Sequence, residues 1–257
     1  MTKAIAVANQ KGGVGKTTTS VNLAASLAAT KRDVLLIDLD PQGNATMGSG
    51  VDKSNLEYSS YDVLMGEKHI CEAMIRSEVC DYNLLPSNID LTGAEVVLLD
   101  GIAREVRLKK ALEAVKNDYE FIFIDCPPSL NMLTVNALVA ADSVIIPIQC
   151  EYYALEGLTA LLATIEKICK YLNPYLRVEG LLRTMYDPRN NLATQVSAQL
   201  LDHFGDKVYH TIIPRNVRLA EAPSHGQPII VYDKSSRGAM AYLALAGEML
   251  NRESQIA

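Results

Sequence analysis

A phosphate-binding loop near the N-terminus restricts the fold of this chain more than any other feature. The apolar run Ala4 to Ala8 leads into KGGVGKT at Lys11 to Thr17, and the following TTSVNL is typical of the start of a helix. A strand that turns through glycines into a helix directs several backbone N–H groups, and the positive end of the helix dipole, at one point. We therefore expect an anionic phosphate chain to bind there.

The residues of this loop have distinct expected parts in binding a nucleotide. The ammonium group of Lys16 is expected to reach the β- and γ-phosphates, and the hydroxyl of Thr17 is expected to ligate Mg²⁺. Backbone N–H groups make further phosphate contacts. The expected nucleotide-binding residues of the loop are Lys11, Gly12, Gly13, Val14, Gly15, Lys16, Thr17 and Thr18.

The loop departs from the common pattern G-x-x-x-x-G-K-[ST] at its first position. Counted back from Gly15, the pattern requires a glycine where this chain has Gln10, and a second lysine, Lys11, precedes the paired glycines. Residue chemistry alone leaves Lys11 open to two interpretations, a functional lysine or a solvated loop charge.

The composition is that of an ordinary globular protein. A length of 257 residues with 49% hydrophobic content suffices for one large α/β domain, and we expect residues 1–257 to form it. No stretch approaches the roughly 18 apolar residues that span a bilayer. The five cysteines are odd in number and include no C-x-x-C pair, so neither a disulfide framework nor a zinc site is indicated. A cytoplasmic location is expected.

Charge is spread unevenly along the chain. The net charge of −6 argues against a polyanionic partner. Residues 1–182, however, carry −7, whereas residues 183–257 carry +1 from 8 basic and 7 acidic side chains. A local basic face in the last third and scattered solvated charges are both compatible with these numbers.

Short apolar runs alternate with helical patterns along the whole chain. Most of the runs are apolar on both faces, as a parallel sheet covered by helices on each side requires. This order predicts an α/β fold, with a doubly wound, mainly parallel sheet flanked by helices on both faces. The predicted strands are Ala4 to Asn9, Val34 to Asp38, Asn83 to Pro86, Phe121 to Asp125, Ser143 to Pro147, Val178 to Met185 and Thr211 to Ile213. The predicted helices are Thr17 to Ala29, Asp90 to Val115 with a break near Asp100, Asn131 to Ala140, Leu155 to Tyr171, Leu192 to His203 and Arg237 to Asn251.

Acidic residues end two of the predicted strands, at the edge of the sheet where such folds bind ligands. Asp38 and Asp40 close the second strand, and we expect Asp40 to orient the attacking water and to contact the metal through water; Asp38 alternatively caps a turn. Asp125 ends the apolar strand FIFID, a context typical of a carboxylate that holds Mg²⁺ through water. The segment Pro41 to Tyr61 between these acids is expected to be the least regular part of the chain.

The nucleotide base is expected to be adenine. Proteins that read guanine carry N-K-x-D or T-K-x-D at the end of a late strand. Here the letters TKRD occur at Thr30 to Asp33, between the first helix and the second strand, too close to the phosphate loop to reach the base. The expected cofactors are therefore ATP and Mg²⁺.

These motifs together resemble the ParA/Soj family of partition ATPases, which belongs to the deviant P-loop group that also holds the MinD proteins. The resemblance runs from Lys3 to about Leu250. It is carried by KGGVGKTT at Lys11 to Thr18, DLDPQGN at Asp38 to Asn44, FIFIDCPPSL at Phe121 to Leu130, TMYDPR at Thr184 to Arg189 and IPRNVRLAEAPS at Ile213 to Ser224.

The resemblance implies further roles for individual residues. It implies a homodimer with two ATP molecules between the subunits, in which Lys11 crosses to the partner's phosphates and Asp40 positions water. It places Pro214 and Asn216 around the adenine. It also implies slow hydrolysis that a ParB/Spo0J-type protein stimulates, and sequence-independent DNA binding by the dimer, for which the candidates are Arg189, Arg218, Lys234 and Arg237.

Alternative functions differ in features that the sequence displays. A MinD-like membrane switch requires a basic amphipathic tail, whereas NRESQIA follows Leu250, so we expect no membrane partner. Related loops also occur in dethiobiotin synthetase-like ligases and in nitrogenase iron-protein-like reductases; the latter need cluster-binding cysteines, and only Cys126 lies near a nucleotide loop. Larger plasmid relatives carry an N-terminal helix-turn-helix domain, which we do not expect here because the first strand begins at residue 4.

Overall fold

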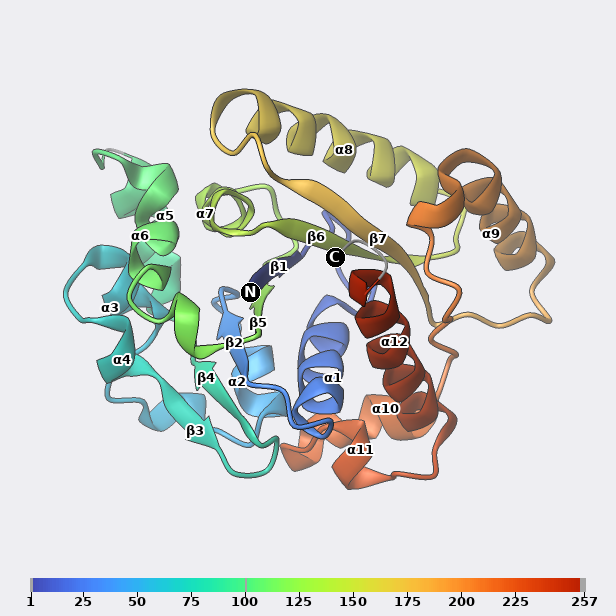
Figure 1. Ribbon diagram of the computed structural model, residues 1–257, viewed down its shortest axis with the longest axis horizontal. Coiled ribbons are helices and arrows are strands. Elements are labelled where there is room, and N and C mark those ends of the chain that lie inside the picture. The colour runs from blue at the N-terminus through green and yellow to red at the C-terminus, as the bar shows by residue number, and fades with distance from the viewer. Residues whose placement is uncertain (1, 100, 255–257) are drawn as a thin grey trace.

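A seven-stranded sheet forms the centre of the computed structural model, which describes residues 2–99 and 101–254 (Figure 1). The strand order is β3-β4-β2-β5-β1-β6-β7, and every neighbouring pair is parallel except β3 and β4 at one edge. The predicted fold class is confirmed. The strands are β1 (Lys3–Val7), β2 (Val34–Asp38), β3 (Ile75–Ser77), β4 (Tyr82–Leu85), β5 (Phe121–Asp125), β6 (Ser143–Gln149) and β7 (Arg177–Thr184).

Helices cover both faces of the sheet (Figure 1). The helices on one face are α1 (Lys16–Ala28), α2 (Asn44–Gly48), α10 (Val217–Glu221), α11 (Ile229–Tyr232) and α12 (Arg237–Ser254). Those on the other face are α3 (Ser60–Met65), α4 (Ile70–Ala73), α5 (Leu91–Leu99), α6 (Arg107–Leu112), α7 (Met132–Ala140), α8 (Ala154–Tyr171) and α9 (Asn191–Phe204). None of the helices in the described part of the chain is both long and apolar enough to cross a membrane.

The central strands bury both of their faces, which explains their continuous apolar sequence. On β1, Ala4 and Ala6 face the core beneath α5 to α8, while Ile5 and Val7 face the core beneath α1 and α12. Successive side chains of a strand point to opposite faces, so the inner positions of a strand covered on both sides are apolar on either face. The small side chains of Ala4 and Ala6 therefore belong to one core, and the larger side chains of Ile5 and Val7 belong to the other.

One predicted strand is absent. Residues 211–213 run beside β7, where the Ile213 N–H donates to the Arg183 carbonyl at 2.9 Å and the Tyr186 N–H donates to the Ile213 carbonyl at 3.1 Å. Only isolated bridges form along this stretch, one of them between Tyr186 and Pro214. Pro214 has no N–H with which to continue a ladder, so the segment remains a loop.

The predicted helix from Asp90 to Val115 is broken as expected, into α5, a 3₁₀ turn at Arg104–Val106 and α6, although Asp100 itself lies outside the described residues. Two other elements differ from the expectation. The segment Pro41 to Tyr61, expected to be irregular, contains α2 and the 3₁₀ turn Lys53–Asn55. The antiparallel strand β3 was not predicted, because three residues are too short for a detectable alternation.

Strand register gathers the predicted acidic residues beside the phosphate loop. β5 lies between β1 and β2, so that Asp125 is paired in register with Val7 on one side and with Asp38 on the other. The loops that follow these three strands therefore emerge side by side at the carboxyl edge of the sheet. This edge is the part of the fold on which the site is built.

We predict that Gly180→Ala destabilises the protein. A Cβ added at this position of β7 would lie 2.4 Å from Cε2 and 2.7 Å from Cδ2 of the fully buried Tyr209 ring. Overpacking of this kind typically costs about 1–3 kcal/mol of unfolding free energy, which thermal unfolding would detect. Gly157→Ala is the matched control, since its Cβ would meet nothing within 4 Å in α8 and alanine favours a helix. Equal melting temperatures for Gly180→Ala and the wild type would contradict this account.

Candidate functional site

The phosphate loop connects β1 to α1 through glycines in the left-handed region. Gly13 has φ of 74°, and Gly15, which precedes α1, has φ of 87°. Side chains with a Cβ rarely adopt this conformation, so these two glycines allow the tight turn. The first-turn N–H groups of α1 are thereby directed at the space enclosed by the loop, where an anion is stabilised.

Lys16 lies inside the loop. Its side chain is buried, and its Nζ donates to the Lys11 carbonyl at 3.0 Å. Burial lowers the pKa of Lys16, and the nearby carboxylates of Asp125 and Asp40 act in the opposite direction. The ammonium group is therefore fixed inside the loop, where it can meet a phosphate.

Asp125 joins the phosphate loop to the sheet. Its Oδ2 accepts a hydrogen bond from the Thr17 hydroxyl at 2.8 Å, and its Oδ1 accepts one from the Ser20 hydroxyl at 2.7 Å. Burial, followed by the charge of neighbouring Asp38, raises the pKa of Asp125. A carboxylate destabilised in this way by desolvation and repulsion favours a nearby cation. Thr17 and Asp125 therefore fit the oxygen ligands that Mg²⁺ prefers.

Asp38 and Asp40 have different surroundings. Asp38 is fully buried and accepts hydrogen bonds from the Asp40 N–H at 3.1 Å and from the Thr46 N–H and hydroxyl at 2.8 Å each, so it holds the loop before α2. Burial raises the pKa of Asp38, against the effect of these hydrogen bonds. The structure thus favours the capping interpretation for Asp38.

Asp40 has one carboxylate oxygen available. Its Oδ1 accepts from the Gln42 N–H at 2.9 Å, and its carbonyl accepts from the Ser87 hydroxyl at 2.8 Å. For Oδ2 no hydrogen bond is present within residues 2–99 and 101–254. The backbone of Asp40 is therefore held from two sides, and one oxygen remains for a water or a ligand near Lys16.

A small cavity of about 180 Å³ adjoins the phosphate loop on the α12 side. Pro214 and Asn216, which the resemblance places around the adenine, both line this cavity, and the Asn216 Oδ1 caps α10 by accepting from the Leu219 N–H at 3.2 Å. Its volume and largely apolar wall suit a flat aromatic ring. The full lining consists of Gly15, Thr18, Thr184, Met185, Ile213, Pro214, Arg215, Asn216, Leu219, Ala220 and Tyr242.

Several of these lining residues were not predicted. The Thr184 hydroxyl donates to the Val14 carbonyl at 2.7 Å and so fixes β7 to the phosphate loop, and Met185 has a φ of 49°. The Tyr242 hydroxyl lies 3.2 Å from that of Thr19. The motif TMYDPR begins at Thr184 and was the available signal for the first two residues. Nothing in the sequence around Tyr242 points to the site, because α12 reaches it through packing on α1, which is distant in the sequence.

Lys11 points away from its own phosphate loop. Its Nζ forms an ion pair with Glu151 just beyond the end of β6, and the two side chains are 42% and 46% exposed. The Lys11 N–H donates to the Asn9 Oδ1 at 3.0 Å, so the backbone is fixed while the side chain extends outward. An exposed pair of this kind contributes at most about 1 kcal/mol, and so it is readily exchanged for another anion.

The four basic residues predicted to bind DNA do not form one cluster of free cations. Arg189 lies in the loop between β7 and α9 and forms a bidentate pair with Asp187 at 2.9 and 2.7 Å. Arg218 on α10 contacts Glu221 at 3.1 Å and Asp233 at 3.7 Å. Lys234 and Arg237 are exposed between α11 and the start of α12, with no ion pair in the described part of the chain.

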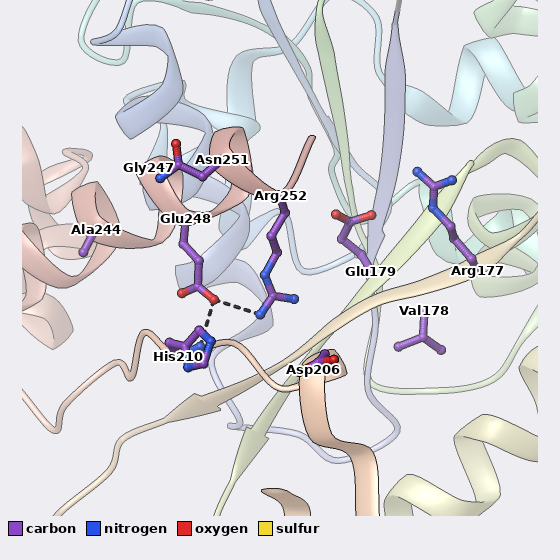
Figure 2. Close-up of a pocket in the computed structure, with 10 residues that line it drawn as sticks. All are labelled: Arg177, Val178, Glu179, Asp206, His210, Ala244, Gly247, Glu248, Asn251 and Arg252. Atoms are coloured by element: carbon purple, nitrogen blue, oxygen red, sulfur yellow. Dashed lines mark hydrogen bonds and ion pairs between the residues drawn. The ribbon is translucent and has the colours of Figure 1, made fainter. Parts of the chain in front are cut away.

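A larger cavity, of about 870 Å³, lies at the opposite edge of the sheet (Figure 2). It is bordered by the first residues of β7 and the last turns of α12. Its main charged groups bind one another: Glu248 accepts from the His210 N–H at 2.8 Å and from Arg252 at 2.8 Å. These contacts fasten α12 to the loop after α9. The phosphate loop and the acidic residues lie at the other edge.

Comparison with known proteins agrees with this geometry. Residues 2–178 match the family described as "AAA domain". The sporulation initiation inhibitor protein Soj of Bacillus subtilis is 57% identical over 249 residues, covering 97% of this chain and 98% of the relative. The chromosome partitioning protein ParA of Caulobacter vibrioides is 51% identical over 253 residues, covering 98% and 95%.

Solved structures share the whole fold. A cobyrinic acid a,c-diamide synthase from Mycobacterium smegmatis with bound ADP and magnesium is 40% identical, covers 100% of this chain and 97% of its own, and has a TM-score of 0.88. The cell division ATPase MinD of Pyrococcus furiosus is 25% identical over 98% of this chain and 99% of its own, with a TM-score of 0.81. The partition proteins have the higher identities over nearly their entire length. This chain belongs to the ParA/Soj family of chromosome-partitioning ATPases.

Proposed function

We propose that this chain is a switch in which Mg²⁺ and ATP close two copies into a dimer that binds DNA without regard to sequence. A ParB/Spo0J-type partner then stimulates slow hydrolysis and releases the dimer from DNA. Relatives that are named as chromosome partitioning proteins support a role in DNA partition. The similar structure with bound ADP and magnesium supports ATP and Mg²⁺ as the cofactors. The protein would act in the cytoplasm on the nucleoid, as a single domain.

The two lysines of the phosphate loop carry this proposal. Lys16 is buried inside the loop, whereas Lys11 projects from it and is held only by an exposed ion pair with Glu151. A lysine that serves its own nucleotide would point inward, as Lys16 does. Lys11 is instead placed to exchange Glu151 for a phosphate on a second copy, which makes binding of the nucleotide and dimerisation one event.

The acidic residues support hydrolysis in the same site. Mg²⁺, when bound, would neutralise charge on the phosphates, and the residues that would hold it are Thr17, Asp125 through water and Asp40 through water. The free oxygen of Asp40 would accept a proton or orient a water, and Lys16 would stabilise the charge that develops on the phosphates. Asp38 keeps the Asp40 backbone in place.

Turnover measurements test the proposed function. We predict a low ATPase rate for the protein alone and a several-fold rise when the ParB-type partner and DNA are added together, because in the proposed switch the partner acts on the DNA-bound dimer. Fast turnover without either would contradict the switch. Activation by anionic liposomes in place of DNA would favour a MinD-like membrane switch instead.

Alanine variants of the two lysines are predicted to lose different steps, ATP binding in one case and dimerisation in the other. Lys16→Ala should abolish ATP binding, because the variant lacks the buried ammonium group inside the loop. Lys11→Ala should retain ATP binding to the monomer but prevent ATP-dependent dimerisation. Fluorescent ATP titration and light scattering would separate these outcomes. An unaltered dimer in Lys11→Ala would show that the exposed lysine does not cross the interface.

Asp40→Ala is predicted to leave ATP-dependent dimers intact and to stop hydrolysis, since the free carboxylate oxygen is removed while the phosphate loop is unchanged. Removal of the general base or water-orienting group typically costs about 10²–10⁴-fold in rate. The trapped dimer should stay on DNA, which a dissociation assay would show. Persistent hydrolysis would assign the water to another residue.

Arg218→Glu is predicted to weaken DNA binding and to flatten its salt dependence while ATP-dependent dimerisation is retained. The logarithm of the DNA-binding constant falls linearly with the logarithm of the salt concentration. The magnitude of this slope should decrease by about one for each DNA phosphate that the variant no longer neutralises. Arg32→Glu is the matched control, because Arg32 is equally a half-exposed arginine in an ion pair, with Glu120, but lies far from α10 between α1 and β2. Equal slopes for Arg218→Glu and the wild type would place the DNA surface elsewhere.

A further inference from the structure

Two adjacent tyrosines, which we call the tyrosine pair, project from the turn between β6 and α8. The side chains of Tyr152 and Tyr153 are 75% and 67% exposed, and their rings meet edge to face with centroids 4.9 Å apart. Edge-to-face contact stabilises a pair of rings, so the two side chains form one protrusion. Tyrosine is enriched in protein interfaces, because its ring is large and its hydroxyl can hydrogen-bond. The tyrosine pair is therefore a candidate contact with another protein.

A cavity of about 340 Å³, which we call the β7 cavity, lies between the ends of β6 and β7 and the start of α9. Glu151, the residue before Tyr152, forms part of its wall, and Met185 and Ala193 contribute apolar atoms. Neither tyrosine occurs among the described residues that line it, so the pair does not fill the cavity of its own chain. A cavity of about 150 Å³ suffices for benzene. The β7 cavity therefore has space for a phenol ring.

The charged groups of the β7 cavity leave one cation available. Its two carboxylates are already in ion pairs, Asp187 with Arg189 and Glu151 with Lys11. The exposed Arg215 lines the same cavity and forms no ion pair within residues 2–99 and 101–254. A guanidinium group stacks on the face of an aromatic ring and donates hydrogen bonds to oxygen. Both the ring and the hydroxyl of a tyrosine thus have a complementary group in this cavity.

The tyrosine pair and the β7 cavity belong to the same surface as Lys11. Glu151 connects all three, because it pairs with Lys11, lines the cavity and directly precedes the tyrosine pair. A second copy that receives Lys11 would therefore face this surface as well. Two copies related by a two-fold axis bring the same patch of each into contact, with residue i against j and j against i. A protrusion beside a hollow suits such an interface, because each copy's protrusion can enter the other's hollow.

The β7 cavity shares part of its wall with the cavity of about 180 Å³ beside the phosphate loop. Met185 and Arg215 line both cavities. Met185 has a φ of 49°, a left-handed conformation that costs about 1–3 kcal/mol in a residue with a side chain and persists only where the surroundings hold it. The Arg215 N–H donates to the Tyr186 carbonyl at 3.2 Å and so joins the two segments of this wall. A ring that enters from one side would therefore act on the wall of the other cavity.

We infer that the tyrosine pair of one copy enters the β7 cavity of a second copy, and that this contact holds the wall beside the phosphate loop closed and slows release of the nucleotide. Tyr152 is the inserted ring, since it is the more exposed of the two, and Tyr153 braces it. This inference rests on the proposed function, because it takes place in the ATP-dependent dimer. It adds a contact, remote from the phosphates, by which each copy retains the nucleotide of the other.

Tryptophan fluorescence tests whether position 152 is buried in the dimer, because the chain contains no tryptophan. In Tyr152→Trp, addition of Mg²⁺ and ATP should shift the emission to shorter wavelengths in step with the light scattering that reports dimerisation. Tyr175→Trp is the matched control, because Tyr175 is 87% exposed in the loop before β7, at the opposite edge of the sheet. Dimerisation without a shift at position 152 would overturn the inference, as would a shift that appears only after the ParB-type partner is added.

Photo-crosslinking identifies what receives the ring. Protein with p-benzoyl-phenylalanine in place of Tyr152 is mixed with isotopically labelled wild-type chain, and Mg²⁺ and ATP are added. Crosslinks should join position 152 to the labelled segment 184–193, which contains Met185 and Ala193 of the β7 cavity. Crosslinks within one chain only, or to other segments of the labelled chain, would overturn the inference.

Removal of the ring should weaken the dimer and speed release of the nucleotide. Tyr152→Ala should bind ATP as the wild-type monomer does, but the dissociation constant of its ATP-dependent dimer should rise at least about tenfold, as for the loss of an aromatic anchor. At concentrations where both proteins are dimeric, fluorescent ATP should leave the variant at least about tenfold faster. Tyr152→Phe, which keeps the ring, should stay close to the wild type, and Tyr175→Ala should equal it. Unchanged release from the Tyr152→Ala dimer would overturn the proposed effect on the nucleotide.

The outcomes separate this inference from the proposed function. A wild-type chain that stays monomeric with Mg²⁺ and ATP would contradict the proposed function, and the inference with it. A wild-type dimer that forms with ATP, while position 152 neither shifts in emission nor crosslinks to segment 184–193, would keep the proposed function and overturn the inference alone.

Discussion

The hydrogen bonds of Asp125 to Thr17 and Ser20 are the interaction on which the site depends. A buried carboxylate at the end of the central strand holds the first turn of α1, and through it the phosphate loop, at a fixed place over the sheet. Ionising a carboxyl group here is costly because the group is fully buried and Asp38 lies on the neighbouring strand, which is why the pKa of Asp125 is raised. A magnesium ion with a nucleotide would relieve that cost. The same desolvation that disfavours the charged carboxylate therefore strengthens its affinity for a cation.

The two lysines of the loop have opposite surroundings, which suit the different roles that we propose for them. Lys16 is buried and fixed, and so it would define the position of the phosphates. Lys11 is tethered to an exposed glutamate by a pair of small energetic value. A chain with only the first lysine could bind a nucleotide without changing its association state. In the proposed switch, the second lysine would give the bound nucleotide a means of recruiting another copy, because a phosphate is a stronger partner for an ammonium group than a solvated carboxylate is.

The sequence was sufficient for the parts of the site that lie on consecutive residues. The phosphate loop and the carboxylates at the ends of β2 and β5 follow from strand-loop-helix patterns, and parallel register then places Asp38 and Asp125 side by side. Contacts between distant segments were not predictable in this way. Tyr242 reaches the cavity beside the phosphate loop from α12 by packing on α1, and the link from Asn131 to Glu95 depends on how α5 and α7 lie together. The incorrect prediction of a strand at residues 211–213 has the same cause. The apolar residues there suit a strand, but only the fold shows that Pro214 interrupts the pairing with β7.

The central claim is that each nucleotide site is completed by a lysine from a second copy, and mixing two inactive variants tests it most directly. Lys11→Ala lacks the residue given to the partner, and Asp40→Ala lacks the residue used within its own site. In a mixed dimer, the site on the Lys11→Ala chain regains a lysine from its Asp40→Ala partner and retains its own Asp40. We therefore expect partner-stimulated ATP hydrolysis to appear only when the two variants are mixed. Mixtures that stay inactive at every ratio, although mixed dimers form, would contradict the account.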